Sequence, residues 1–281
     1  MSPSRQSRRT GRPQGRWPRL LAVAFLVVLG ACDHPAGRAD RPLVLLCGAG
    51  LQPAVEALVA AFHEQRGLLV IPDYGGSGLI LTRARSGDPA DLFMPGDVSY
   101  VEALAEDPGR ILERADIAFL VPCLIVRPGN PKGITTLADW RRDGIHAAVG
   151  NPAACEIGRV TAGLLERHGL APADLDAKQS LTVNELGLWV AMGDVDSAVV
   201  WESTAAALGS RVEAVPLPIE AASVSRVTLA VLSGGTQAAA ARDFLRFCRQ
   251  PRGRAIVAGC GYRVEPPPGV AALAGEAGGP P

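Results

Sequence analysis

The sequence of 281 residues lacks the residue clusters on which most catalytic and metal sites depend. Its four histidines are scattered, and none has a partner at the spacing of a metal-ligand pair. The glycine-rich segment Tyr74–Gly78 has neither the Gly-x-Ser-x-Gly pattern of a hydrolase nucleophile nor the lysine that completes a phosphate-binding P-loop. We therefore expect a protein that is not an enzyme and has no metal or cofactor of its own.

The chain also has no formal net charge at neutral pH, because 28 Lys and Arg residues balance 28 Asp and Glu residues. Part of the positive charge lies ahead of Leu20, so the rest of the chain is mildly acidic. Such a balance argues against binding to nucleic acid and against electrostatic attachment to a membrane surface.

The six cysteines include no Cys-x-x-Cys motif. Apart from Cys32 their number is odd, which supports neither a disulfide framework nor a thioredoxin-type site. Cys248 and Cys260 are spaced to pair across a C-terminal helix and the turn after it. The alternative is that all five are small buried apolar side chains, namely Cys47, Cys123, Cys155, Cys248 and Cys260.

Cys32 follows an arginine-rich start and the uncharged segment Leu20–Ala31. This order is typical of a secretion signal, and Leu29–Cys32 resembles the lipobox of bacterial lipoproteins, whose cysteine becomes lipidated. The apolar run is shorter than the roughly 20 residues that span a bilayer, and an uncleaved membrane anchor is the alternative. We expect residues 1–31 to form the signal peptide, Cys32 to carry the lipid, and residues 32–42 to form a tether.

From Leu43 onward the apolar pattern alternates between strand and helix. The expected strands are Leu43–Leu46, Leu68–Ile71, Leu92–Met94, Ala147–Val149, Ala198–Trp201 and Val227–Leu232. One helix is expected between Pro53 and Gly67, and the others are Leu79–Ser86, Val98–Ala105, Ile157–His168, Leu186–Met192 and Ala238–Arg249. A long apolar segment, Ile117–Val126, separates two such α/β units.

This repetition predicts an α/β fold of mostly parallel sheets flanked by helices, in two lobes around a cleft. We expect residues 43–123 plus 225–265 to form lobe 1 and residues 124–224 to form lobe 2. Residues 266–281 are rich in proline and glycine and are expected to be a disordered tail.

Several turns lie where a strand ends and a helix begins, which is where open α/β sheets bind ligands. These turns are Gly50-Leu51, Gly76–Gly78 and Cys155–Gly158. Helix N-termini bind anions through unpaired N–H groups, and Ser77 adds a hydroxyl donor. Because the first two turns contain no Arg or Lys, we expect a small, fully ionised oxyanion held by uncharged donors. The alternative is that the glycines are ordinary turn residues.

The order of these motifs resembles that in a known family. Val44–Leu51 followed by a helix, Tyr74–Gly78 and Pro89–Met94 are similar to the N-terminal lobe of the molybdate- and tungstate-binding proteins of ABC importers. The resemblance covers residues 43–264. It implies a type II periplasmic binding fold whose two lobes close by a hinge motion, and a monomer whose partner is an ABC permease.

In that family two serine hydroxyls, backbone amides and a tyrosine hydroxyl hold the oxyanion. By position, Ser77 falls on the second serine, Gly50 on the first, Ile157 and Val183 on amide donors of the far lobe, and Trp201 on the tyrosine. Gly50 offers only its backbone N–H and Trp201 only an indole N–H. Losing one of about six donors would weaken binding by roughly one or two orders of magnitude, unless another group compensates or the ligand differs. Alternatively, Ser77 caps a helix and Trp201 is a core or cleft-wall aromatic.

Several polar residues lie beside these positions. Carboxylates would repel an oxyanion, so Glu156, Glu185 and Glu202 are expected, with Asn184, to point outward or to hold contacts between the lobes. A cation or neutral ligand is favoured if Glu156 or Glu202 faces the cleft. Cys155 is a thiolate candidate for a bound metal, but it has no second cysteine nearby.

The sequence thus predicts a lipid-anchored receptor of the periplasm or cell envelope that captures molybdate, tungstate or a similar oxyanion for an ABC permease. One alternative keeps the fold but binds a metal complex or a small organic acid. A second is a sensor that reports the ligand to a membrane receptor. A third is an envelope hydrolase, for which Ser77 is the only obvious nucleophile.

Overall fold

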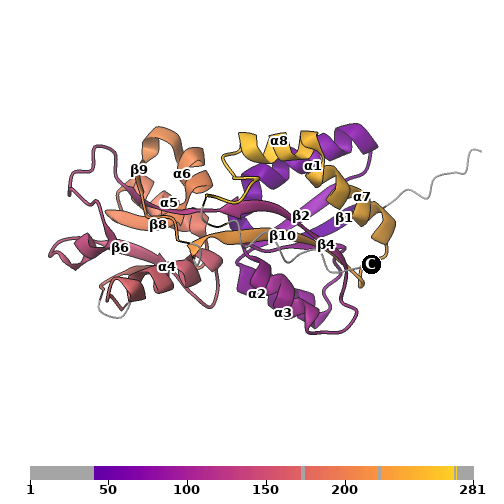
Figure 1. Ribbon diagram of the computed structural model, residues 1–281, viewed down its shortest axis with the longest axis horizontal. Coiled ribbons are helices and arrows are strands. Elements are labelled where there is room, and N and C mark those ends of the chain that lie inside the picture. Colours follow the sequence, from indigo (N-terminus) through magenta and orange to yellow (C-terminus); the bar gives the residue numbers. More distant parts are fainter. Residues whose placement is uncertain (1–40, 172–174, 221–222, 269, 271–281) are drawn as a thin grey trace, which may run out of the picture. The chain divides into compact units, whose positions relative to one another are not determined.

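The computed structural model describes residues 41–171, 175–220, 223–268 and 270, which belong to one compact unit. Two mixed five-stranded sheets organise this unit (Figure 1). Sheet A has the strand order β2-β1-β3-β10-β4, and sheet B has the order β7-β6-β8-β5-β9. Each sheet with its helices is a lobe, called lobe A and lobe B below.

Lobe A is a layer of strands between two layers of helices. Its strands are β1 (Leu43–Gly48), β2 (Val70–Gly75), β3 (Leu92–Met94), β4 (Ile111–Leu120) and β10 (Ser225–Leu232). Helices α1 (Gln52–Arg66), α7 (Ala238–Arg249) and α8 (Pro251–Gly259) cover one face, and α2 (Ser77–Ser86) and α3 (Val98–Ala105) cover the other (Figure 1).

Strand β1 is a continuous run of apolar residues because both of its faces are buried. Successive side chains of a strand point to opposite faces. Leu45 and Cys47 pack in the core cluster that includes Phe62 of α1, whereas Leu46 packs with Phe93 in the cluster on the other face. Both faces of the strand are therefore covered, which the run of buried residues in β1 requires.

Lobe B repeats this plan with different strands. They are β5 (Pro122–Val126), β6 (Ala147–Gly150), β7 (Lys178–Ser180), β8 (Ser197–Trp201) and β9 (Glu213–Pro216). Helix α4 (Glu156–Arg167) lies on one face, and α5 (Val183–Met192) and α6 (Glu202–Leu208) lie on the other (Figure 1).

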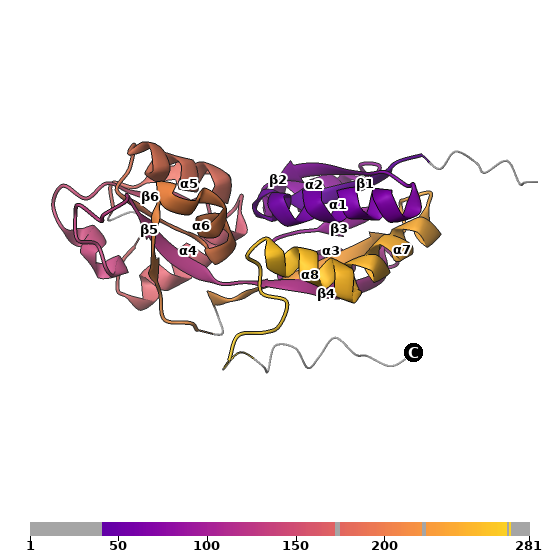
Figure 2. The same cartoon turned by 90° about the horizontal axis from the view of Figure 1, so that it is seen from above.

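The chain passes twice between the lobes, from β4 into β5 and from β9 back into β10 (Figure 2). Because β4 leaves lobe A and β10 enters it, these neighbouring strands run antiparallel. Strand β5 is likewise antiparallel to β8 and β9. The remaining pairs, β1 with β2 and β3, and β6 with β7 and β8, are parallel. The sheets are therefore mixed, whereas the strand–helix repetition alone predicted mostly parallel ones.

The ends of helices and strands agree best with the predictions where a glycine or proline lies at the end of an element. Strand β3 and helices α3 and α7 have the predicted bounds. Helix α1 ends at Arg66, just before Gly67, whose backbone is left-handed. The strand predicted at Leu68–Ile71 lies instead at Val70–Gly75. Pro72 is tolerated there because β2 is an edge strand.

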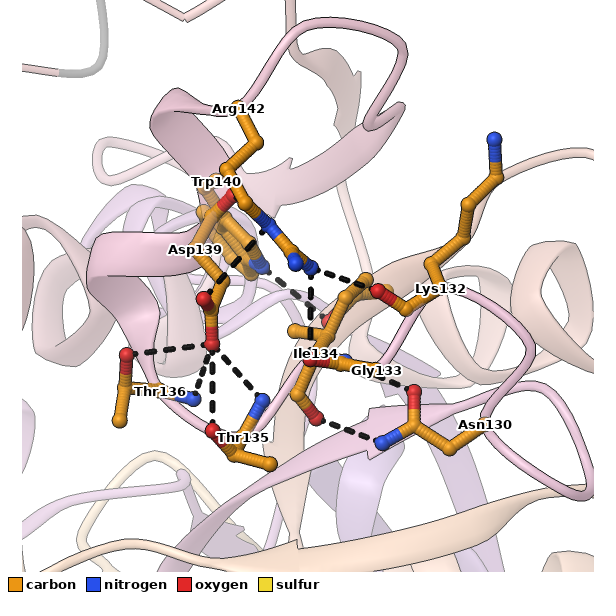
Figure 3. Close-up of polar contacts among 10 residues, drawn as sticks. Asn130, Lys132, Gly133, Ile134, Thr135, Thr136, Asp139, Trp140 and Arg142 are labelled. Carbon is orange, nitrogen blue, oxygen red and sulfur yellow. Dashed lines mark hydrogen bonds and ion pairs between the residues drawn. The ribbon is translucent and has the colours of Figure 1, made fainter.

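The connection between β5 and β6 is stabilised by its own side chains (Figure 3). The Asp139 carboxylate accepts the backbone N–H groups of Thr135 and Thr136 at 2.8 and 2.9 Å, and these bonds lower its pKa. The same connection holds Trp140, whose indole N–H donates to Ser197 Oγ at 3.2 Å. Ser197 begins β8, so this connection helps to fix the strand that ends at Trp201.

The ends of the chain fall largely outside the described residues, including the predicted signal peptide at residues 1–31, the lipidation site Cys32 and residues 271–281. Val270 is buried against Phe119, Val121 and Val224, so the chain is still packed four residues beyond the predicted start of the tail at Pro266. No helix among the described residues is long and apolar enough to cross a membrane. All five described cysteines are free, so Cys248 and Cys260 do not pair.

Candidate functional site

A small pocket lies where β1, β2 and β8 end and where the two lobes meet. Its cavity volume is about 30 Å³, which is room for a few water-sized groups. All five residues that the sequence singles out line it, namely Gly50, Ser77, Ile157, Val183 and Trp201. The structure thus brings these positions together, while their role in binding remains a prediction.

The starts of helices from both lobes surround this pocket. Gly50 lies in the short helix η1 (Ala49–Leu51), Ser77 is the first residue of α2, Ile157 the second of α4, and Val183 the first of α5. Amides in the first turn of a helix have no acceptor within that helix. Helices η1, α2 and α4 also lack a side-chain cap. The pocket therefore gathers backbone N–H groups and the positive ends of helix dipoles.

Ser77 is held so that its hydroxyl proton stays available. It is buried, and its Oγ accepts the backbone N–H of Gly96 at 3.0 Å. A hydroxyl that accepts one bond can still donate its own proton. The N-cap of α2 is Gly76, and Ser77 is the first residue of the helix. The interpretation of Ser77 as the helix cap is therefore wrong.

Among the residues that the structure describes, Glu156 is the only charged one that lines the pocket, and its carboxylate binds Arg159 and Ser225. Arg159 forms an ion pair with both carboxylate oxygens, and Ser225 Oγ donates to Oε1 at 2.9 Å. Burial raises the pKa of Glu156, whereas the bond from Arg159 opposes that shift. The paired guanidinium balances the carboxylate charge beside the pocket.

The other flanking polar residues hold contacts, as expected from the sequence. Asn184 donates to the carbonyl of Ala49 across the lobes at 3.1 Å. Glu202 pairs with Arg263 at 3.0 Å, which joins α6 to the segment after α8. Glu185 lies 2.5 Å from the hydroxyl of Ser180 within lobe B. None of these three lines the pocket.

The Cys155 thiol is buried beside the pocket and has a backbone partner. Its Sγ lies 3.6 Å from the carbonyl oxygen of Asn151, and burial raises its pKa, so the thiol stays protonated at neutral pH. No group of three His, Cys, Asp or Glu side chains that could hold a metal occurs in the described part of the chain.

Sequence reasoning did not assign three residues that shape the pocket. Gly96 supplies the N–H that orients Ser77, and Tyr262 donates to the carbonyl of Gly50 at 2.6 Å, which fixes η1. Thr182, the N-cap of α5, also lines the pocket. The spacing Thr182-x-x-Glu185 is a capping-box pattern that could have located this helix start. Tyr262 gave no local signal, because its partner is 212 positions away.

Comparison with known proteins matches residues 43–263 to the family of bacterial extracellular solute-binding proteins. Over 248 residues the chain is 27% identical to the molybdate-binding protein ModA of Mycobacterium tuberculosis, which covers 86% of this chain and 94% of that protein. The periplasmic molybdate-binding protein of Azotobacter vinelandii has a TM-score of 0.66 at 19% identity, covering 80% of this chain and all of that one. The sulfate-binding protein SubI of Mycobacterium tuberculosis has a TM-score of 0.69 at 23% identity, covering 83% and 90%.

The chain belongs to the bacterial extracellular solute-binding proteins. It is a non-enzymatic protein of ABC uptake, which works outside the cytoplasm with a permease and a small ligand. The two-lobed periplasmic binding fold predicted from the sequence is confirmed. At such low identity the solved structures show the fold alone, so the ligand must be argued from the pocket.

Proposed function

We propose that the pocket binds a tetrahedral oxyanion of the molybdate or tungstate type, which the protein delivers to an ABC permease. The observation that carries this proposal is the set of uncapped helix starts from both lobes around one cavity. The starts of η1 and α4 offer the amides of Gly50 and Ile157, and Ser77 at the start of α2 adds its hydroxyl. The start of α5, which Thr182 caps, adds the amide of Val183. Such donors suit an anion with no proton of its own.

The composition of the lining supports this ligand class over the alternatives. No Arg or Lys of the described residues lines the pocket, so a bound anion would be recognised through hydrogen bonds. A hydrogen phosphate ion would need an acceptor for its proton, and the carboxylate of Glu156 is already engaged by Arg159 and Ser225. A cavity of about 30 Å³ is small for an organic acid.

Close approach of the lobes is part of the proposed binding. A Cβ on Gly76 would lie 2.2 Å from the carbonyl oxygen of Ala154, and one on Gly78 would lie 2.4 Å from that of Ala153. Only glycine lets these two backbones meet. We propose that residues 43–123 plus 225–265 move against residues 124–224, so that closure brings the donors of both lobes to the ion.

We also propose that the mature protein is a lipoprotein anchored through Cys32. The support is the order of the N-terminal sequence, in which basic residues, the uncharged segment Leu20–Ala31 and Leu-Gly-Ala-Cys follow one another. A lipid on Cys32 would keep the receptor at the membrane that holds its permease.

Isothermal titration of the mature protein with molybdate, tungstate, sulfate and phosphate tests the ligand. Molybdate and tungstate should bind, and phosphate, which keeps a proton at neutral pH, should bind much more weakly. Ser77→Ala should weaken molybdate binding about tenfold to a hundredfold, because a charge-assisted hydrogen bond is lost. Ser86→Ala, the same change at the far end of α2, should leave the affinity unchanged. No binding of any of the four ions would refute the proposed function.

Gly76→Ala tests closure of the lobes. The backbone at Gly76 (φ −65°, ψ 146°) accepts alanine without strain. The added Cβ therefore affects the protein through its contact with Ala154 of the other lobe. Molybdate affinity should fall by at least about tenfold, because the added Cβ keeps Ala154 away. Gly259→Ala, which points into open space at the end of α8, should bind as the unaltered protein does. Unchanged affinity in Gly76→Ala would show that this approach is not needed.

Lipidation is tested with the full chain expressed in a bacterial host. The protein should partition into the detergent phase of a Triton X-114 extract, and mass spectrometry should find an acylated N-terminal Cys32. Cys32→Ser should abolish both results, whereas Cys260→Ser should change neither. Retention of residues 1–31 in the membrane-bound protein would instead favour an uncleaved anchor.

A further inference from the structure

Glu156 brings a carboxylate to a pocket that the proposed function lines with hydrogen-bond donors. It is the first residue of α4 and directly precedes Ile157, one of the proposed amide donors. A Cβ built on Gly96 would lie 3.2 Å from both the Cβ of Glu156 and the Oγ of Ser77, so these two side chains lie against the same glycine. Glu156 is only 3% exposed. A charge of the same sign as the proposed ligand is therefore buried next to a proposed donor.

The oxygens of this carboxylate are already bound. The Arg159 guanidinium donates from Nε to Oε2 at 3.0 Å and from Nη2 to Oε1, which is the bidentate geometry that makes arginine–carboxylate pairs strong. Ser225 at the start of β10 donates from its Oγ to Oε1 at 2.9 Å. Burial and the negative charge of Glu156 raise the pKa of Tyr100, so its phenol stays protonated near the same group. Little acceptor capacity of Glu156 is left for a ligand.

Arg159 is held in this position from lobe A. Its Nη2 lies 4.0 Å from Oδ1 of Asp97, which precedes α3. The Asp97 carboxylate is fixed in turn by the backbone N–H groups of Ser99 and Arg226, at 2.9 and 3.1 Å. Arg159 itself does not line the pocket, and half of its side chain is exposed. Its contact with the lining is made through Glu156.

A free carboxylate at this place would change which oxyanions the pocket accepts. Molybdate and tungstate carry no proton at neutral pH, whereas phosphate keeps one. An ionised carboxylate only accepts hydrogen bonds, so an unoccupied Glu156 would accept the proton of hydrogen phosphate and repel a bare oxygen. With Arg159 in place that proton finds no carboxylate to accept it, and a buried polar group left without a partner is costly.

We propose that Arg159 is a positioning residue that determines specificity: by holding both oxygens of Glu156, it withholds the acceptor that a protonated oxyanion needs. The pocket then favours ions that carry no proton. The inference rests on the proposed function and assigns its selectivity to a residue outside the pocket. The carboxylate at the pocket discriminates only when its arginine is lost.

The ratio of the dissociation constants of phosphate and molybdate tests this role by calorimetric titration. Mildly alkaline pH is used, because it favours the ionised form of an unpaired Glu156 while phosphate still carries a proton. Arg159→Met keeps the length of the side chain and removes its donors. The ratio should therefore fall about tenfold to a hundredfold, as phosphate gains a charged acceptor. Arg167→Met, the same change at the last residue of α4, should leave the ratio unchanged, because Arg167 pairs with Glu220 away from the pocket.

Two further variants separate this role from a structural one. Arg159→Met combined with Glu156→Met removes the acceptor together with its partner, so the ratio should return to that of the unaltered protein. Damage to packing would instead weaken both ions alike and leave the ratio unmoved. Arg159→Lys keeps the charge but lacks the bidentate fork, so its ratio should lie in between. It also serves if Arg159→Met does not fold, because the buried carboxylate keeps a cationic partner.

The outcomes distinguish this inference from the proposed function. If the unaltered protein binds none of the four oxyanions, both fail. If it binds molybdate but the ratio is unchanged in Arg159→Met and Arg159→Lys, Arg159 does not determine specificity and the proposed function stands. A ratio that falls in Arg159→Met and recovers in the double variant supports the inference.

Discussion

The candidate site depends on backbone N–H groups at helix starts that have no hydrogen-bond partner within their own helix. Every helix begins with amides that have no partner inside it, and most proteins cover them with a side-chain cap or water. Here η1, α2 and α4 start at the same cavity without such a cap. Several donors facing one small space suit an anion. Because no described Arg or Lys lines the pocket, the proposed recognition depends on the placement of these donors and not on net charge.

The two crossings of the chain are what bring these helix starts together. Strands β4 and β10 run in opposite directions between the lobes, so the carboxyl ends of β1 and β2 face the end of β8. Glycine at position 76 then lets the backbones of the two lobes approach. The Glu156–Arg159 pair reaches Ser225 at the start of β10. One ion pair therefore neutralises the carboxylate near the pocket and ties lobe B to the returning strand.

Much of the fold was readable from the sequence, because glycine and proline mark the ends of strands and helices locally. The resemblance to the molybdate- and tungstate-binding proteins also pointed to five positions that the structure brings together around one pocket. What could not be read depends on distant partners. Ser225 and Tyr262 gain their roles only from contacts across the chain, and the mixed sheets follow from the direction of the crossing strands. The position of Ser77 could not be settled from the local sequence. The helix cap is Gly76, one residue earlier, so Ser77 is the first residue of α2 and its hydroxyl lines the pocket.

A crystal structure of the mature protein with molybdate, phased on the anomalous scattering of molybdenum, tests the central claim most directly. The account predicts one strong anomalous peak between η1, α2, α4 and α5. Its oxygens should lie at about 2.7–3.2 Å from the Ser77 hydroxyl and the amides of Ile157 and Val183. A peak held by surface arginines, or a pocket filled only by water, would contradict it.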